Sequence, residues 1–146
     1  MTEAEDRATS SPTDVVERLA DALDRDDYVT AASLMADRIE YIIGEQEKSG
    51  PEAVIASYRD ASQMAHRLFD RVEYGHHVMP THDPNTFQVS YSDTLTVAGE
   101  TLKHMAEQHV TVAPAEGVVR IVNIEVPGER EKVDAFMERH GLARDP

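Results

Sequence analysis

The feature of this sequence that most limits its fold is a run of alternating apolar and polar side chains over residues 86–112. A period of two over this length predicts two long, half-buried strands, joined by a tight turn at Ala98 and Gly99. The largely apolar side of these strands would carry Phe87, Val89, Tyr91, Asp93, Leu95 and Val97 on the first strand, and Leu102, His104, Ala106, Gln108, Val110 and Val112 on the second.

The same pattern predicts the register of the hairpin. With the turn at residues 98–99, the two apolar faces coincide, Leu95 lies opposite Leu102, and Asp93 lies opposite His104. Directly opposed residues have Cβ atoms roughly 5 Å apart. A slip of one residue would turn one apolar face to the solvent, so this register is favoured. We therefore expect an acid and an imidazole to meet within an apolar stripe.

Composition excludes several classes of function. The chain has 146 residues, enough for one domain with a real core, and a formal net charge of −14. Such a surface repels phosphate groups, so we expect neither nucleic acid nor an anionic membrane as a partner. Cysteine is absent, which excludes disulfides, thiolate catalysis and cysteine-based metal sites.

The ends of the chain and its hydropathy predict a simple organisation. Residues 1–12 are acidic and polar, without the basic start and apolar core of a secretory signal, and we expect a disordered tail there. Residues 13–146 would form a single domain. No apolar run is long enough to span a membrane, and we expect a cytoplasmic protein.

Helix and strand signals can be placed along the rest of the chain. Ser11 and Pro12 predict a helix start, and Asp26–Asp27 would end that helix and cap a short second one. The remaining elements are expected at residues 28–36 (helix), 38–44 (strand), 45–50 (polar turn), 51–70 (long helix), 72–78 (strand), 79–85 (loop), 118–126 (strand) and 129–140 (helix).

This order predicts an α+β fold. Hairpin strands of about 11 residues are long enough for the sheet to twist and curve strongly. We expect a curved, mostly antiparallel sheet wrapped around the long helix, in the form of a cone-shaped α+β barrel with one open end.

The order of elements resembles the nuclear transport factor 2-like superfamily and, within it, the SnoaL-like group. The resemblance covers roughly residues 13–126. It rests on the topology and on three short segments: Asp26–Asp27, the sequence GPEAV at residues 50–54 and EGVVRI at residues 116–121. It implies an apolar pocket, a homodimer, and either isomerase, dehydratase, cyclase or hydrolase chemistry or no chemistry at all. Catalytic residues differ between members, so none is carried over by motif.

Three residues of the hairpin form the candidate catalytic group. Burial raises the pKa of a carboxyl group and a neighbouring imidazolium lowers it, so a coupled pair can hold a proton near neutral pH. Asp93 would act as general base or acid, His104 would orient it or share its proton, and Tyr91 would polarise a substrate oxygen. Alternatively, the pair only fixes the strand register, or Asp93 is solvated at the rim.

Five further side chains are expected to bind a ligand: Tyr41, Tyr58, Tyr74, His76 and Gln108. A tyrosine supplies ring area and one hydroxyl, which suits a pocket wall and equally suits core packing. A site of His76, His104 and Asp93 could hold a metal in principle. No spacing typical of metal ligands supports it, and no glycine-rich phosphate loop is present, so we expect neither a metal nor a cofactor.

Two faces are ambiguous in the sequence. On the last strand the inward set is either Val118, Arg120, Val122, Ile124 and Val126, which is more apolar and therefore favoured, or Val119, Ile121, Asn123 and Glu125. The other side of the hairpin is either solvated or a dimer interface and carries Ser90, Ser92, Thr94, Lys103, Glu107, His109 and Thr111.

Three functions remain open. The protein could be a cofactor-independent acid–base enzyme for a small apolar organic molecule, a ligand-binding domain without chemistry, or an interaction module whose cone is filled by its own side chains.

Overall fold

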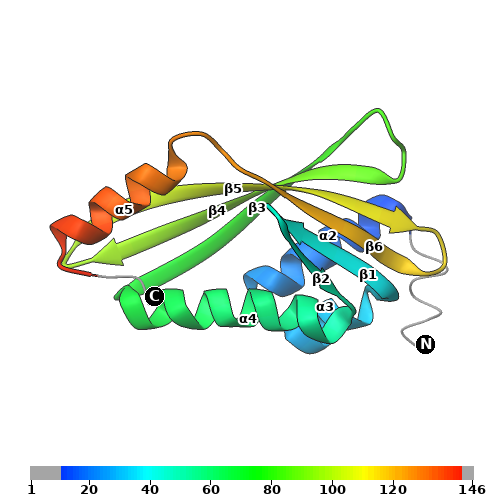
Figure 1. Cartoon of the computed structure of the whole chain (residues 1–146), viewed down its shortest axis with the longest axis horizontal. Coiled ribbons are helices and arrows are strands. Elements are labelled where there is room, and N and C mark those ends of the chain that lie inside the picture. The colour runs from blue at the N-terminus through cyan, green and yellow to red at the C-terminus, as the bar shows by residue number, and fades with distance from the viewer. Residues whose placement is uncertain (1–10, 143–146) are drawn as a thin grey trace.

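A computed structural model describes residues 11–142 of the chain (Figure 1). The disorder predicted for residues 1–12 falls outside this range, except for Ser11 and Pro12, which begin the first described helix. The elements are α2 (Pro12–Asp24), α3 (Tyr28–Ser33), β1 (Met35–Ile43), β2 (Gln46–Ser49), α4 (Pro51–Leu68), β3 (Arg71–Pro80), β4 (Thr86–Val97), β5 (Glu100–Ala113), β6 (Gly117–Ile124) and α5 (Glu129–Arg139).

The strands form one curved sheet in the order β2-β1-β6-β5-β4-β3. Neighbouring strands are antiparallel, except that β1 and β6 are parallel. In Figure 1, α4 runs along one side of the long strands and α5 lies against the end of β4 and β5. The α+β class and the curved, mostly antiparallel sheet are therefore confirmed, while the sheet stays open rather than closing into a barrel. Within residues 11–142, no helix is long and apolar enough to cross a membrane.

The long hairpin has the predicted register. Asp93 pairs with His104, and Leu95 pairs with Leu102. The turn residues Ala98 and Gly99 have φ angles of 50° and 79°. Two successive positive φ angles match the right-handed twist of the flanking strands, which is why so short a turn can connect them.

Helices α2 and α3 begin at the predicted caps. The Ser11 hydroxyl accepts a hydrogen bond of 3.2 Å from the backbone N–H of Asp14. At the break between the helices Asp26 has a φ of 55°, and the carboxylate of Asp27 accepts from the N–H of Thr30 at 3.2 Å. Positive φ is incompatible with continuing a right-handed helix, so α2 ends and α3 starts in a new direction.

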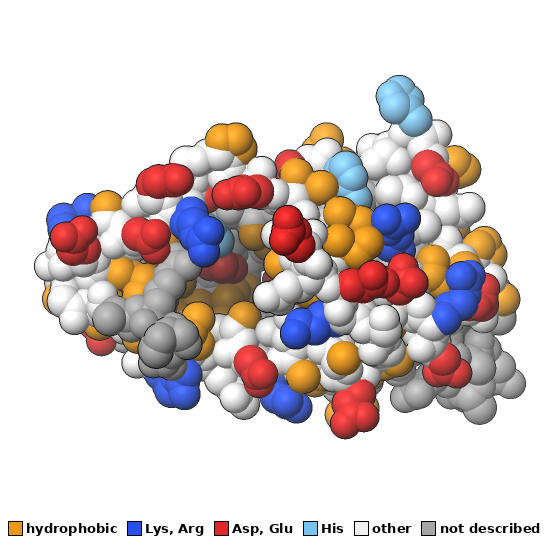
Figure 2. Space-filling model, viewed as in Figure 1, with side chains coloured by type: hydrophobic (Ala, Val, Ile, Leu, Met, Phe, Trp, Pro, Cys, Tyr) orange, Lys and Arg blue, Asp and Glu red, His pale blue; other side chains and the backbone are white. Residues whose placement is uncertain are grey.

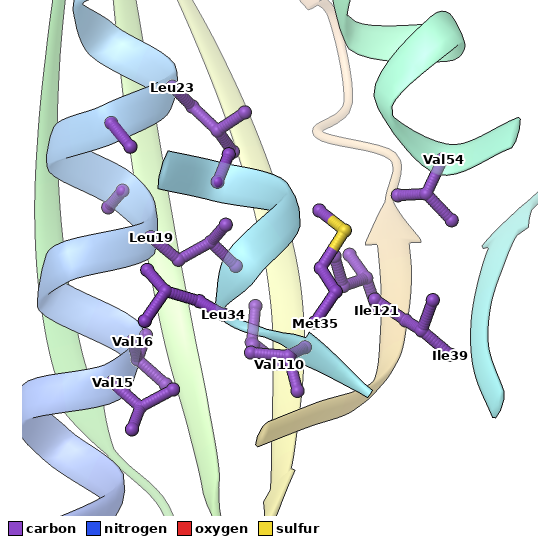
Figure 3. Packing of buried hydrophobic residues seen from close by; sticks show 14 of the residues in the cluster. Val15, Val16, Leu19, Leu23, Leu34, Met35, Ile39, Val54, Val110 and Ile121 are labelled. Carbon is purple, nitrogen blue, oxygen red and sulfur yellow. The ribbon is translucent and has the colours of Figure 1, made fainter. Parts of the chain in front are cut away.

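The hydrophobic core is divided in two. One cluster joins α2, α3 and the start of α4 to the sheet, and Figure 3 shows Leu19, Leu23 and Leu34 packing towards Val110 and Ile121. The second cluster lies where α5 meets the ends of α4 and the hairpin, and consists of Phe69, Leu95, Val133, Phe136 and Met137. The middle of the hairpin lies between these clusters.

Three details differ from the sequence predictions. Residues 45–50 were expected to be a turn, but Gln46–Ser49 pairs with β1 as an edge strand; its mostly exposed, charged and polar side chains gave no strand alternation. The second helix ends at Ser33 because its capping residue Leu34 leads directly into β1, which starts at Met35 instead of residue 38. Strand β3 extends to Pro80, two residues into the expected loop.

The favoured face of the last strand was wrong beyond Val118. The β5–β6 register shifts at Val112: Thr111 pairs with Arg120, whereas Val112 pairs with Val118. This bulge inserts one extra residue in β6 and changes which side chains face inward. Val118 and Ile121 are both buried, and Arg120 is exposed.

Candidate functional site

A cavity of ≈ 240 Å³ lies between the two hydrophobic clusters. All five tyrosines of the chain line it, together with three aspartates, and the lining contains no lysine, arginine or histidine. Its main polar and aromatic residues are Asp24, Asp26, Tyr28, Tyr41, Tyr58, Ser62, Tyr74, Tyr91, Asp93, Gln108 and Asn123. The surface is hollowed between the α5 end of the sheet and α4 (Figure 2).

The position of the cavity follows from the inward side of β4. Phe87 and Val89 belong to the first cluster and Leu95 belongs to the second. Tyr91 and Asp93 lie between them and face the cavity. The strand therefore supplies packing residues at both ends and titratable, cavity-lining residues at its centre.

A hydrogen-bonded network forms the first wall of the cavity. The Tyr58 hydroxyl donates to Oε1 of Gln108 at 2.8 Å, and Nε2 of Gln108 donates to the Tyr41 hydroxyl at 2.9 Å. The rings of Tyr41 and Tyr58 stack with centroids 5.2 Å apart. Burial raises the pKa of both hydroxyls, so they remain protonated at neutral pH.

A second network surrounds the carboxylate of Asp26. Its Oδ1 accepts hydrogen bonds of 2.8 Å from the hydroxyls of Tyr28 and Ser62. Ser62 also lies 2.9 Å from the Tyr74 hydroxyl, and Nε2 of His66 is 3.5 Å from Oδ2 of Asp26. Burial and the bond to Asp26 raise the pKa of Tyr28 to about 12. The Asp26 carboxylate thus connects α3 to α4 directly and reaches β3 through Ser62 and Tyr74.

The predicted pair of Asp93 and His104 is present. Oδ2 of Asp93 is 3.3 Å from Nδ1 of His104, and the two side chains are 31% and 28% exposed. Asp93 lines the cavity, whereas His104 lies behind it, outside the lining. Tyr91 also lines the cavity, and within residues 11–142 its hydroxyl makes no hydrogen bond. Burial raises the pKa of this hydroxyl, which keeps it available as a proton donor.

A second pair of the same type lies at the end of α2. Oδ2 of Asp24 is 2.6 Å from Nδ1 of His76, and the side chains are only 16% and 13% exposed. Burial raises the pKa of Asp24 against the opposing hydrogen bond and charge of His76. Burial alone would lower the pKa of His76, but its bonds to Asp24 and Glu17 and the charge of Asp21 raise it.

The cavity therefore collects most of the proposed site residues from the sequence. Tyr41, Tyr58, Tyr74, Tyr91, Asp93 and Gln108 all line it. His104 supports Asp93 from behind, and His76 supports Asp24 instead of facing the cavity. Among residues 11–142 no group of three or more acidic or histidine side chains is arranged to hold a metal ion.

Sequence reasoning missed Asp24, Asp26, Tyr28 and Ser62 as parts of the site. Asp24 and Asp26 follow the apolar stripe of α2 and look like ordinary polar residues at a helix end. A usable signal was the spacing of Glu17, Asp21 and Asp24, which places three carboxylates on one face of the helix.

Solved structures of other proteins resemble this chain in fold, although their sequences differ widely from it. No protein-family model and no curated protein matches the sequence. A solved NTF2-like protein of unknown function from Exiguobacterium sp. 255-15 superposes with a TM-score of 0.60 and 15% identity, over 77% of this chain and 98% of that one. The chain has the nuclear transport factor 2-like fold. The resemblance inferred from the order of elements is thereby confirmed at the level of the fold.

Two further solved structures are similar to this chain in fold. One is a putative polyketide cyclase from Pseudomonas putida KT2440, with a TM-score of 0.64 and 12% identity over 84% of this chain and 97% of that one. The other is a Mycobacterium tuberculosis protein in complex with estradiol-17β-hemisuccinate, with a TM-score of 0.61 and 17% identity over 82% and 98%. At these identities the likeness shows the fold alone.

Proposed function

We propose that this protein is a cofactor-independent acid–base enzyme for a small, largely apolar organic molecule. The observation that carries the proposal is the pair of Asp93 and His104 at the wall of a cavity lined by all five tyrosines. A cavity of ≈ 240 Å³ is slightly smaller than the roughly 300–1,000 Å³ typical of drug-sized ligands, which favours a compact substrate.

Each catalytic residue has a definite role in this proposal. Asp93 takes a proton from substrate carbon or from water, and His104 holds the carboxylate in place. Tyr91, whose hydroxyl has no partner among residues 11–142, donates a hydrogen bond to the substrate oxygen on which charge develops. Isomerisation, dehydration, cyclisation and hydrolysis all use these two operations, and the structurally similar Pseudomonas putida protein is a putative polyketide cyclase.

A generic proton-abstraction probe tests the proposal without knowledge of the natural substrate. When a base removes the C3 proton of 5-nitro-1,2-benzisoxazole, the N–O bond breaks and a coloured phenolate forms. We expect the protein to accelerate this reaction about 10²-fold or more over acetate at equal concentration. Asp93→Asn should abolish most of the acceleration, whereas Asp60→Asn, at an exposed position on α4, should retain it. An Asp93→Asn variant with full activity would refute the assignment.

A ligand-binding protein without chemistry is the second candidate. It is favoured by the structurally similar Mycobacterium tuberculosis protein, which was solved in complex with estradiol-17β-hemisuccinate. In that case the probe would not turn over, and Asp93→Asn would change only binding affinities. The open cavity does not favour the third candidate, an interaction module with a filled cone.

We also propose that the protein is a cytoplasmic homodimer that associates through the outer face of β4 and β5. This face carries half-buried Ser90, Ser92 and Thr94, and Gln88 donates a hydrogen bond to Glu107 across it. Light scattering after size exclusion should give twice the mass of the 146-residue chain. Either Ser92→Lys or Ser92→Glu, close to the middle of the face, should shift the mass to that of one chain.

A further inference from the structure

We infer that Asp24 is a second proton-carrying residue of the cavity, and that His76 positions it and links it to solvent through Glu17 and Asp21. The inference rests on the proposed function, because it assigns the general acid of the same site. Its starting point is geometric: Asp24 lines the cavity from the end of α2 and is held by a histidine of β3.

The pair of Asp24 and His76 is more closely organised than the pair of Asp93 and His104. The shortest nitrogen–oxygen distance is 2.6 Å in the first pair and 3.3 Å in the second. Its side chains are also about half as exposed. A short, shielded contact fixes the orientation of the carboxyl group, which general acid catalysis requires.

The outer side of His76 faces two exposed carboxylates. Nε2 of His76 is 3.3 Å from Oε2 of Glu17 and 3.5 Å from Oδ1 of Asp21, and these side chains are 46% and 61% exposed. Glu17, Asp21 and Asp24 occupy successive turns on one face of α2, so all three reach the same imidazole. The result is a continuous series of proton-exchanging groups from water, through His76, to Asp24 and the cavity.

The surroundings separate the roles of the two cavity carboxyls. The charged or titratable groups around the Asp24–His76 pair are Glu17 and Asp21 on α2, Tyr91, which pairs with His76 from β4, and Asp93 farther along β4. Burial and, to a smaller extent, the charges of Asp21 and Asp93 raise the pKa of Asp24, whereas the hydrogen bond and charge of His76 oppose this rise. Two carboxyls in different environments commonly divide the work of acid and base. Because Asp24 lines the cavity and is connected to solvent through His76, we assign it as the proton donor, and Asp93, on the facing strand, as the acceptor.

A balanced step can be written for the unsubstituted probe 1,2-benzisoxazole. Asp93 takes the C3 proton, the electrons of the C–H bond form the nitrile, and the N–O bond breaks. The departing oxygen takes the proton of Asp24, which gives 2-cyanophenol. Asp24 then recovers a proton from solvent by way of His76, and Asp93 releases its proton to solvent, so no other reactant is needed.

Two probes with different leaving groups test the acid. The phenolate that forms from 1,2-benzisoxazole is more basic than the one that forms from the nitro analogue. Its departure therefore depends more on proton donation. Asp24→Asn should therefore slow the reaction of 1,2-benzisoxazole at least tenfold more than that of 5-nitro-1,2-benzisoxazole, whereas Asp93→Asn should slow both equally. Asp60→Asn serves as the control, and thermal denaturation of each variant reports its folding.

His76→Gln tests the positioning residue. The charge and hydrogen bond of His76 lower the pKa of Asp24, and the variant removes that charge. The pKa of Asp24 should therefore rise, and the alkaline limb of the pH profile for 1,2-benzisoxazole should move to higher pH. If the pair only anchors α2 to β3, His76→Gln would lower the melting temperature and leave the alkaline limb unchanged.

The possible outcomes separate the inference from the proposed function. If the protein accelerates neither probe, both fail. If Asp93→Asn abolishes the acceleration and Asp24→Asn behaves like Asp60→Asn, the proposed function stands and the inference is overturned. Equal slowing of both probes by Asp24→Asn, or an unmoved alkaline limb in His76→Gln, also overturns it. A selective loss on the unsubstituted probe supports it.

Discussion

The hydroxyl of Tyr58 on α4 donates a hydrogen bond of 2.8 Å to the side-chain carbonyl of Gln108 on β5. Gln108 is the one buried polar residue within residues 11–142, with 4% of its surface exposed, and it also donates to Tyr41 on β1. A single amide thus connects the long helix to two strands at the cavity wall. Because both of its side-chain atoms have partners, its burial is compatible with a stable core.

Gln108→Leu should destabilise the protein by about 1–3 kcal/mol, because it leaves the hydroxyls of Tyr41 and Tyr58 without their partner. Urea denaturation followed by circular dichroism measures the change. Tyr58→Phe, which removes one hydroxyl, should cost about 1 kcal/mol. In the double variant the two losses should be less than additive, since both changes break the same bond. Strict additivity would contradict the network.

The sequence predicted the hairpin well for a physical reason. Alternation over residues 86–112 is long, and only one register buries both apolar faces, so the pairing of Asp93 with His104 could be deduced. The sequence could not predict which side chains of β6 face inward, because the bulge beside Val118 depends on how β5 and β6 fit together. The role of Asp24 was equally hidden, since its partner His76 is 52 residues away in the chain.

His76 should make the stability of the protein depend on pH. Its pKa in the folded protein is raised above the ordinary value of 6.5. The corresponding stabilisation is fully present below pH 6.5 and is lost as the pH rises through the raised folded value. The free energy of unfolding should therefore fall on the alkaline side of this range, and His76→Gln should reduce the fall. A variant with the same pH dependence as the parent would show that other groups cause it.

The hairpin turn offers a stabilising substitution. Ala98 has a φ of 50°, which is unfavourable for a residue with a Cβ atom, and its N–H donates to Oδ2 of Asp70 at 2.8 Å. Asparagine adopts this conformation more readily, and Asn-Gly is the preferred sequence for such turns. Ala98→Asn should stabilise the protein by about 0.5 kcal/mol and leave the cavity unchanged. Urea denaturation measures the change: Ala98→Asn should raise the urea midpoint, whereas Ala98→Val, with a β-branched side chain, should lower it.

The negative charge of the cavity should make ligands of similar size bind with different affinities according to their own charge. The carboxylates of Asp26 and Asp93 line it beside Asp24, and the lining within residues 11–142 contains no basic side chain. A carboxylate-bearing ligand would meet like charges at close range, which costs several kcal/mol in a desolvated site, whereas an ammonium group would pair with them and with the tyrosine rings. Three naphthalene probes of similar size carry a positive, a neutral and a negative group: 1-naphthylmethylamine, 1-naphthalenemethanol and 1-naphthoate. We expect the dissociation constant to be at least tenfold lower for the amine than for the carboxylate.

Titration of these probes, followed by chemical-shift changes in the protein, gives the three affinities. Asp93→Asn should weaken the binding of the amine and strengthen the binding of the carboxylate. The neutral alcohol should bind as before, because the asparagine side chain is nearly the same size as that of aspartate. Asp60→Asn removes the same charge from the surface and should leave all three affinities nearly unchanged. If the surface variant shifted the amine as much as Asp93→Asn, the selection would come from the overall charge of −14 and not from the cavity.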